Sequence, residues 1–460
     1  MSISSKFKRV RQQRIQKYVQ ESHANQFFNL LTSEELLWAV EDALPDHRER
    51  YYPPTQTLSM FLAQALNADR SCQKVVNDVA LSRVAMGLTP TSIATGGYCK
   101  ARQRLPVSLI SNLVHKTAQL VDERTPTQWR WQGKSVRLID GTTVTMPDTV
   151  ANQSVYPQQG GQKPGLGFPI CRIVGAICLS SGMLLNARVG RFNGKGSDEH
   201  TLLRQMLDTF SAGDVVLGDA FYGTYFLLAA LIEQEVDVVF EQMGQRRRVT
   251  DFRTGVRLGE RDHLVELPKP VIKPEWMSRT QYDALPTSLT LREVKVGHKI
   301  LITTLLSSKA APKSELKALY KRRWEIEVDL RNIKTTLGME TLSCKTPEMN
   351  EKEIWVYFLA YNLIRLLMAQ AALLADILPR QLSFKHTLQL WLAWQQYDKK
   401  IPCDEHMLFI LIAQKRVANR PGRIEPRAVK RRPKPLPLLM LPRQQARKKV
   451  LKYGHPKKLK

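Results

Sequence analysis

The run ALYKRRWEIEVDLRNIKTTLGME, residues 318–340, decides how the fold of this chain is interpreted. No Gly or Pro occurs between residues 313 and 337, so the run predicts one long helix. At about 100° per residue, its apolar side chains gather on one side. They are Leu319, Ile326, Leu330, Ile333 and Leu337. We expect this apolar seam to pack against the protein core.

A second stripe on the same helix carries polar residues at the spacing Y-x2-R-x3-E-x6-K. Its members are Tyr320, Arg323, Glu327 and Lys334. With Tyr320 taken as zero, the other three fall at about 300–340°, beside the apolar seam. Glu325 and Asp329 fall on the opposite side, where a solvated face is expected. Of the three acids in this run, Glu327 is therefore the one expected near the core.

A simpler interpretation of the polar stripe is a pair of helical salt bridges. Arg323 and Glu327, and likewise Glu327 and Arg331, have the i,i+4 spacing of such pairs. Pairs of this kind are common and contribute only about 0.2–0.5 kcal/mol each. The helix alone leaves both interpretations open, so the choice rests on the rest of the chain.

The chain is strongly basic. Its 460 residues include 69 Lys and Arg against 42 Asp and Glu, which gives a net charge of +27. A surplus of this size indicates a polyanionic partner, either nucleic acid or an anionic membrane. The most apolar stretch, residues 355–374, is interrupted by Asn362, Arg365 and Gln370, which are costly in lipid. We therefore expect a buried core helix there, with no membrane contact and with nucleic acid as the partner.

The cysteine pattern argues against zinc and disulfides. The six cysteines are scattered and form no C-x2-C pair, so a zinc site is not expected. The basic N-terminus is not followed by the apolar segment of a signal peptide, although an organellar presequence over residues 1–17 is an alternative. The pattern predicts a reduced, cytoplasmic protein.

Changes in composition divide the chain into helical, mixed and basic parts. Short runs rich in Val and Ile predict strands at residues 136–140, 170–179, 184–190, 214–220 and 236–242. Helical stretches between some of them favour an α/β fold with a central sheet covered by helices. The expected divisions are a basic arm at 1–20, a helical domain at 21–125, an α/β core at 130–242 and 311–375, a β-rich insertion at 243–310, a helical region at 376–414 and a basic tail at 415–460.

The basic tail has a composition of its own. It holds 17 Lys and Arg, a single acid and seven prolines. Such a segment cannot bury enough apolar surface to build a core. We expect it to be extended or disordered.

Two aspartates follow predicted strands and share an orientation. Asp140 ends the strand VRLID, and Asp219 comes directly after the strand VVLG. Each has the parity of the buried residues in its strand, so its side chain is expected on the core side at the mouth of the sheet. Sites in open α/β sheets form at the carboxyl ends of strands. The alternative for Asp140 is a turn, because Asp140 and Gly141 form a common turn dipeptide.

Glu327 would bring a third acid to the same place. Three converging carboxylates in a basic chain indicate a divalent metal site that acts on phosphodiesters, because Mg²⁺ and Mn²⁺ prefer oxygen ligands. Two ions about 3.5–4 Å apart would activate the attacking oxygen and stabilise the leaving one. Arg323 and Lys334 would then bind DNA phosphates.

With these residues in place, the chain resembles the DDE transposases of the insertion-sequence-four family. The resemblance rests on the Y-x2-R-x3-E-x6-K spacing, on Asp140 within IDGTTV and on Asp219 within LGDAFYG. It extends over about residues 25–440. Further similar segments are YCKARQRLP at 98–106, KTTLGMETLSCKTPEM at 334–349 and NRPGRIEPRAVKRRPKP at 419–435.

The resemblance implies a fold, an activity and a set of site residues. The fold is an RNase H-like catalytic core with the β-rich insertion between its second and third acids. Asp140, Asp219 and Glu327 are implied as catalytic metal ligands, for Mg²⁺ or Mn²⁺ and for two ions. Tyr320, Arg323 and Lys334 are implied to contact DNA. The enzyme would cut double-stranded DNA at transposon ends and join the freed 3′-OH to target DNA, as a homodimer on paired ends in the bacterial cytoplasm, at the nucleoid.

Two other functions remain open at this point. One is an RNase H-like nuclease that cuts DNA without strand transfer. The other is an inactive, domesticated derivative that only binds DNA, although binding alone does not require three carboxylates. The segment that reads bases is also open: the N-terminal helical domain is expected to bind DNA, with Arg102 and Arg104 as weak candidates. Trp276 is a candidate for stacking on an unstacked base, with a packed Trp as the alternative.

Overall fold

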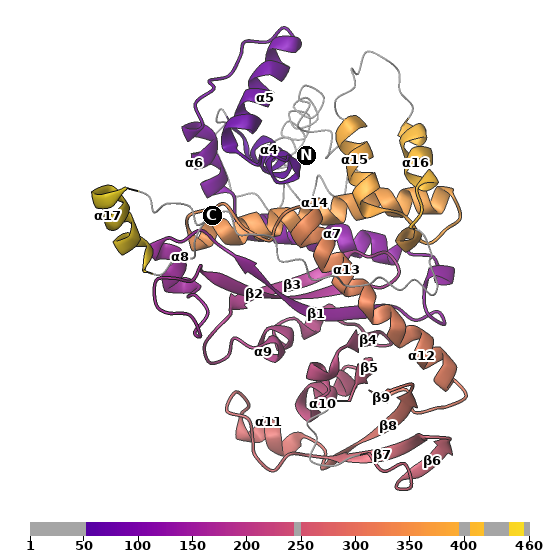
Figure 1. Ribbon diagram of the computed structural model, residues 1–460. Helices are drawn as coiled ribbons and strands as arrows, with labels where there is room; N and C mark the ends of the chain where they lie inside the picture. Colours follow the sequence, from indigo (N-terminus) through magenta and orange to yellow (C-terminus); the bar gives the residue numbers. More distant parts are fainter. Residues whose placement is uncertain (1–51, 243–249, 395–404, 418–440, 455–460) are drawn as a thin grey trace, which may run out of the picture.

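The computed structural model describes residues 52–242, 250–394, 405–417 and 441–454. Within these residues the chain is α/β, with a single 9-stranded sheet in the order β3-β2-β1-β4-β5-β9-β8-β7-β6 and helices against its faces (Figure 1). The expected basic arm at residues 1–20 lies outside the described residues.

The inner half of the sheet is formed by five strands close to those expected. They are β1 (Val136–Thr145), β2 (Ile170–Cys178), β3 (Leu184–Arg191), β4 (Val215–Gly218) and β5 (Asp237–Glu241). β2 is antiparallel to both β1 and β3, whereas β1, β4 and β5 are parallel. Their Val- and Ile-rich runs are buried on both faces, as expected for parallel strands covered by helices.

The outer half of the sheet comes from residues 256–303. Its strands are β6 (Val256–Gly259), β7 (Asp262–Pro268), β8 (Ser288–Val296) and β9 (Lys299–Thr303), and a short helix, α11 (Arg279–Ala284), lies between β7 and β8. All four strands pair antiparallel with their neighbours, and β9 is antiparallel to β5. The β-rich segment therefore extends the central sheet rather than forming a separate one.

Helices cover the two faces of the inner strands with separate apolar clusters. One face is covered by α7 (Val107–Glu123) and α14 (Pro347–Leu374), and the other by α9 (Glu199–Arg204) and α10 (Tyr225–Glu233) (Figure 1). β1 contributes to both clusters, with Val136 and Leu138 on the α14 face and Ile139 on the α9 face. This alternation fixes which face each later residue of β1 points to.

The apolar helix α14 is buried in the protein. It has 28 residues and is long and apolar enough to cross a membrane, but 83% of its most apolar window lies inside the structure. Both Asn362 and Arg365 on this helix are buried, and each makes hydrogen bonds within the protein. The expectation of a core helix is confirmed. Two further helices, α15 (Phe384–Trp394) and α16 (Glu405–Gln414), pack against it.

The N-terminal helices form a smaller cluster beside α14. They are α4 (Pro54–Leu66), α5 (Cys72–Ala85) and α6 (Gly96–Arg104), and α4 packs on α14. Arg102 is buried on α6, where its guanidinium donates to Gln64 and lies over the rings of Phe61 and Tyr98. The idea that Arg102 reads bases is therefore wrong, because its side chain holds these helices together. Arg104 is exposed.

Part of the basic tail is helical. Helix α17 (Arg443–Tyr453) contacts the region around α8 (Val150–Val155), where Arg443 pairs with Asp148 at 2.9 Å and lies 4.0 Å from the ring centre of Phe168. None of the α17 residues is buried, so the helix adds nothing to a core. The expectation of an extended tail is wrong for this segment, because residues 443–453 lack Gly and Pro and are rich in good helix formers. Residues 418–440 and 455–460 lie outside the described residues.

Candidate active site

The helical run that carries the polar stripe is continuous but not uniform. It passes from α12 (Lys313–Lys321) through a 3₁₀ turn (Arg322–Trp324) and α13 (Glu325–Arg331) into a π-helical segment (Asn332–Thr336). A helical wheel drawn at 100° per residue therefore misplaces side chains along this run, since the 3₁₀ and π segments turn by different angles per residue. The apolar seam is nevertheless confirmed: all five of its side chains are buried.

The polar stripe crosses the carboxyl ends of the parallel strands. Tyr320 lies at the end of β5, where its hydroxyl donates to Glu241 at 3.2 Å. Arg323 follows beside β1, with its guanidinium 4.0 Å from Asp140. Lys334 lies in the π-helical segment, near enough to the start of β2 for its charge to act on the thiol of Cys171. The stripe is thus a row of polar groups over the mouth of the sheet.

Asp140 lies in the middle of β1, not at its end. β1 continues to Thr145 and pairs with β2 through Gly141, so both the strand end and the turn expected there are wrong. On its other side, however, β1 pairs with β4 only from Val136 to Leu138. Asp140 is therefore beyond the last pair of the parallel ladder, which leaves its side chain at the open edge beside β4.

Asp219 stands beside Asp140 at this edge. Leu138 is paired with Leu217, so extending the register by two residues sets Asp140 next to Asp219. Asp219 caps the short 3₁₀ turn that follows β4, where its Oδ1 accepts the N–H of Phe221 at 2.8 Å. The capping bond fixes the carboxylate at the strand end.

Arg323 lies between Glu327 and Asp140. Its guanidinium donates to Glu327 Oε1 at 2.8 Å and lies 4.0 Å from Asp140 Oδ2. The expected i,i+4 pair therefore exists, but its cation also reaches across to β1. No ion pair joins Glu327 to Arg331 among the described residues. Arg323 thus connects Glu327 to Asp140, which in turn lies beside Asp219 at the end of β4.

Burial and, to a smaller extent, neighbouring negative charge favour the protonated form of Asp140. Burial raises the pKa of this carboxyl to about 6, and the negative charge of Asp219 acts in the same direction. The N–H of Gly141 and the guanidinium of Arg323 oppose the shift only in part. A second cation at this edge would relieve the remaining repulsion.

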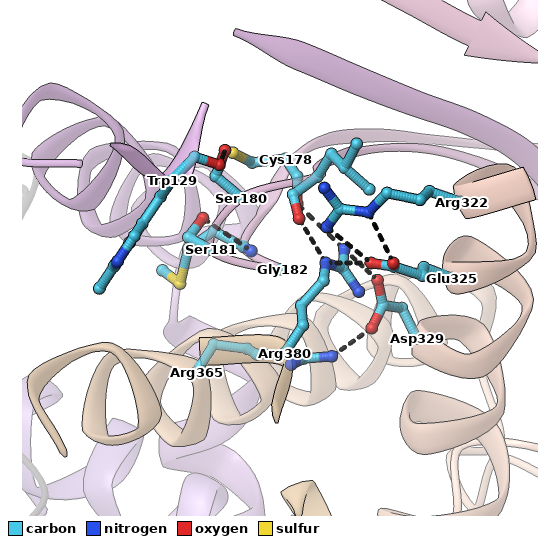
Figure 2. Close-up of polar contacts among 12 residues, drawn as sticks. Trp129, Cys178, Ser180, Ser181, Gly182, Arg322, Glu325, Asp329, Arg365 and Arg380 are labelled. Carbon is cyan, nitrogen blue, oxygen red and sulfur yellow. Dashed lines mark hydrogen bonds and ion pairs between the residues drawn. The ribbon is translucent and has the colours of Figure 1, made fainter. Parts of the chain in front are cut away.

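The other two acids of the helical run differ in exposure but share a partner. Figure 2 shows Glu325 and Asp329 pointing toward Arg380. Asp329 is fully buried between Arg365 and Arg380, and Arg380 Nη2 donates to it at 2.8 Å. Glu325 pairs with Arg380 and with Arg322. The expected solvated face is wrong for Asp329, because Arg365 of α14 and Arg380 of the 3₁₀ turn Pro379–Gln381 cover it, whereas Glu325 remains partly exposed. The expectation that Glu327 is the acid held near the core is also wrong, since Asp329 is the fully buried one.

The donor set fits a hard divalent cation, although it is not assembled around one. The three acids offer carboxylate oxygens only, which suit Mg²⁺ or Mn²⁺. No group of three or more His, Cys, Asp or Glu side chains in the described ranges is gathered closely enough to hold a metal ion. Arg323, which lies between Asp140 and Glu327, occupies the position of the neutralising cation in this structure.

One acidic residue near Asp140 was missed by reasoning from the sequence. Glu199 begins α9, and its carboxylate lies against Gly141 on β1. Its charge also contributes to the raised pKa of Asp140. The available signal in the sequence is Gly141 itself, because a glycine within a strand marks the close approach of another group.

Trp276 lies apart from the acids, near α10. Its ring is about half exposed, and the Arg204 guanidinium lies 4.0 Å from the ring centre. Phe226 packs edge-on against it, with 6.1 Å between ring centres. Its interactions are therefore partly those of a packed residue.

The chain is similar in sequence to known proteins. The family described as the transposase DDE domain matches residues 131–363, a range that includes all three acids. The transposase InsG for insertion sequence element IS4 of Escherichia coli (strain K12) is 30% identical over 351 residues, which cover 74% of this chain and 75% of InsG. Among solved structures, a cryo-EM structure of a piggyBac transposase synaptic complex with hairpin DNA is similar with a TM-score of 0.41 and 10% identity, over 87% of each chain.

Proposed function

The chain belongs to the DDE transposases of the IS4 family, and on this basis we propose that Asp140, Asp219 and Glu327 are its catalytic acids. It is a DNA transposase, and its DDE domain implies dependence on divalent metal ions. The observation that supports this assignment is the position of Asp140 beside Asp219 at the end of β4, with Glu327 connected to Asp140 through Arg323.

We further propose that the catalytic core is RNase H-like. The strand order β3-β2-β1-β4-β5, in which β2 runs opposite to the other four strands, supports this assignment. The core would comprise residues 130–242 and 311–375, with 243–310 inserted between the second and third acids. The pairing of β9 with β5 gives this insertion a fixed edge on the core.

The three acids would hold two Mg²⁺ ions, for which Mn²⁺ can substitute. When bound, the ions supply activation of the attacking oxygen and stabilisation of the leaving oxygen in phosphodiester chemistry. Arg323 and Lys334 bind phosphates of the DNA, because they lie in one row over the same strand ends. Tyr320 contacts the DNA at the β5 end of this row and is oriented by its hydrogen bond to Glu241.

The substrate is double-stranded DNA, both at transposon ends and in the target. The net charge of +27 supports extensive phosphate contact, including contact by the basic tail. We propose a homodimer on paired ends that acts in the bacterial cytoplasm at the nucleoid, without membrane association. The burial of α14 inside the protein agrees with the last point.

An assay of the full chain on labelled DNA from the borders of its own element tests the proposal. With Mg²⁺ and a target plasmid, the wild-type protein is expected to nick the ends and to form joined products. Asp140→Asn, Asp219→Asn and Glu327→Gln are each expected to abolish both steps and to retain DNA binding. Unimpaired nicking by any of the three would remove that residue from the site.

The same assay separates the alternatives. Nicks without joined products would indicate a nuclease. DNA binding without nicking by the wild-type protein would indicate a binding derivative. The intact set of three acids favours an active enzyme over the binding derivative.

A further inference from the structure

Arg380, in the 3₁₀ turn Pro379–Gln381, binds both acids that flank Glu327 on α13. Its Nε lies 2.8 Å from Glu325, and its Nη2 donates to Asp329 at 2.8 Å (Figure 2). Glu325 and Asp329 are four residues apart and therefore share one side of the helix. At about 100° per residue, Glu327 lies about 160–200° away from them. Arg380 thus holds α13 from the side opposite to the proposed metal ligand.

The same guanidinium binds the end of β2. Its Nη2 donates to the carbonyl of Cys178 at 3.1 Å, and its Nε donates to the carbonyl of Leu179. β2 pairs with β1 along its whole length, and this pairing includes Asp140. Arg380 therefore joins the helix that carries Glu327 to the neighbour of the strand that carries Asp140.

The end of β2 is itself fixed against α14. In the turn that follows β2, Gly182 has a φ of 78°, and a Cβ built on it would lie 2.7 Å from the guanidinium carbon of Arg365. Tyr361 donates to the carbonyl of Gly182 at 2.8 Å and accepts from Arg365 Nε at 2.8 Å. Arg365 also pairs with Asp329. The strand end that Arg380 binds is therefore held in place by α14.

Charge compensation alone does not account for these contacts. Asp329 is already paired with Arg365, and Glu325 has Arg322 at 2.9 Å. A guanidinium carries five donors in a rigid planar fork, so Arg380 orients the groups that it joins as well as balancing their charge. Only 10% of its side chain is exposed, and moving any of its four acceptors would leave a buried donor without a partner.

We propose that Arg380 is a positioning residue for Glu327 and acts on it through the far side of α13. By fixing the rotation of α13 relative to β2, it sets how Glu327 is presented toward Asp140. This inference rests on the proposed function, since the position of Glu327 affects catalysis only if these acids hold the metal ions. Glu325 and Asp329 then serve the reaction indirectly, as the groups by which Arg380 holds the helix.

Binding of Mn²⁺ to the full chain, followed by electron paramagnetic resonance titration, tests the inference without relying on activity. Arg380→Lys keeps the charge and loses the planar fork, so we expect Mn²⁺ to bind about 10- to 100-fold more weakly. Arg137→Lys is the matched control, because Arg137 is also buried between two acids, Asp122 and Asp214, which lie outside α13. It should lower the melting temperature and leave the affinity for Mn²⁺ unchanged.

A double substitution shows whether Arg380 acts through Glu327. Glu327→Gln alone should weaken Mn²⁺ binding. Adding Arg380→Lys to it should cause no further weakening, because the side chain that Arg380 positions no longer binds the ion as a carboxylate. A general effect of Arg380→Lys on the fold would instead add to the effect of Glu327→Gln.

The outcomes separate this inference from the proposed function. If Glu327→Gln weakens Mn²⁺ binding and Arg380→Lys leaves it at the wild-type value, Arg380 does not position Glu327 and the inference is overturned. Equal weakening by Arg380→Lys and Arg137→Lys, or additive losses in the double variant, overturn it as well. If Glu327→Gln binds Mn²⁺ as tightly as the wild type, the proposed metal site itself is wrong.

Discussion

Glu327 and Asp329 are two residues apart on α13, yet they lie in opposite kinds of surroundings. Asp329 is fully buried, and two guanidinium groups, from Arg365 and Arg380, compensate its charge (Figure 2). Glu327 is about one-third exposed and has Arg323 as its ion-pair partner, one that also serves Asp140. The Asp329 carboxylate is buried and its charge is neutralised by two arginines. The Glu327 carboxylate is partly exposed and shares its arginine partner with Asp140.

The difference separates a structural acid from one available for chemistry. A buried charge with a complete set of partners is costly to disturb and has no oxygen free for a new ligand. A partly exposed acid that shares its arginine partner with Asp140 can exchange this protein cation for a metal ion. The degree of pairing, more than the degree of burial, therefore distinguishes the two roles.

The largest expected effect is on stability and concerns the buried acid, Asp329. Asp329→Ala should lower the free energy of unfolding by about 3–5 kcal/mol, because it leaves Arg365 and Arg380 buried without their counter-charge. Urea unfolding followed by circular dichroism measures the change. Glu325→Gln, at a more exposed position of the same network, should change it by about 1 kcal/mol or less. An Asp329→Ala protein as stable as the wild type would show that Asp329 is not a structural acid.

For the partly exposed acid, Glu327, the expected effect is on catalysis. Glu327→Gln should slow cleavage of end DNA at least about a thousandfold, or about 4 kcal/mol in the barrier, because a metal site contributes several kcal/mol of transition-state stabilisation. Its free energy of unfolding should change by less than about 1 kcal/mol, since it loses one partly exposed ion pair. Single-turnover cleavage and urea unfolding of the same preparation provide both values. A large loss of stability would instead assign Glu327 to the structural class.

The pH dependence of stability sharpens the comparison further. The pKa of Asp140 is about 6 in the folded protein against an ordinary value of 3.8. Its favourable contribution is therefore complete below pH 3.8 and is lost as the pH rises through about 6. Without metal, Asp140→Asn should be more stable than wild type by about 1–3 kcal/mol at pH 7–8. The gain should vanish below pH 4 and shrink when Mn²⁺ is added; a difference independent of pH contradicts the repulsion.

The smallest expected effect concerns the two arginines. Arg323→Gln should weaken DNA binding by about tenfold or less and reduce the slope of log affinity against log salt by about one, as for a lost phosphate contact. Arg380→Gln should destabilise the fold and leave that slope unchanged, because its guanidinium is committed to Glu325 and Asp329. Fluorescence anisotropy at several salt concentrations measures both slopes. An unchanged slope in Arg323→Gln would remove it from the DNA surface.

Local pattern was sufficient to predict the inner strands, the helical run and the position of Asp140 beside Asp219. Those features depend on periodicity and parity, which a sequence carries directly. The burial of Asp329 was not predictable in this way, because its partners lie 36 and 51 residues further along the chain. The length of β1 was also not predictable, since Gly141 is typical of turns. A glycine is needed at this position because Glu199 on α9 approaches it closely. Both errors arise because contacts between segments that are distant in the sequence determine the structure at these positions.

Anomalous scattering from Mn²⁺ in crystals of the full chain with end DNA tests the central claim most directly. We expect anomalous peaks for two ions about 3.5–4 Å apart, both bound by Asp140, Asp219 and Glu327. We also expect Asp329 to keep its contacts with Arg365 and Arg380 and to bind no ion. A peak at Asp329, or the absence of ions from the three acids in crystals that cleave DNA, would contradict it.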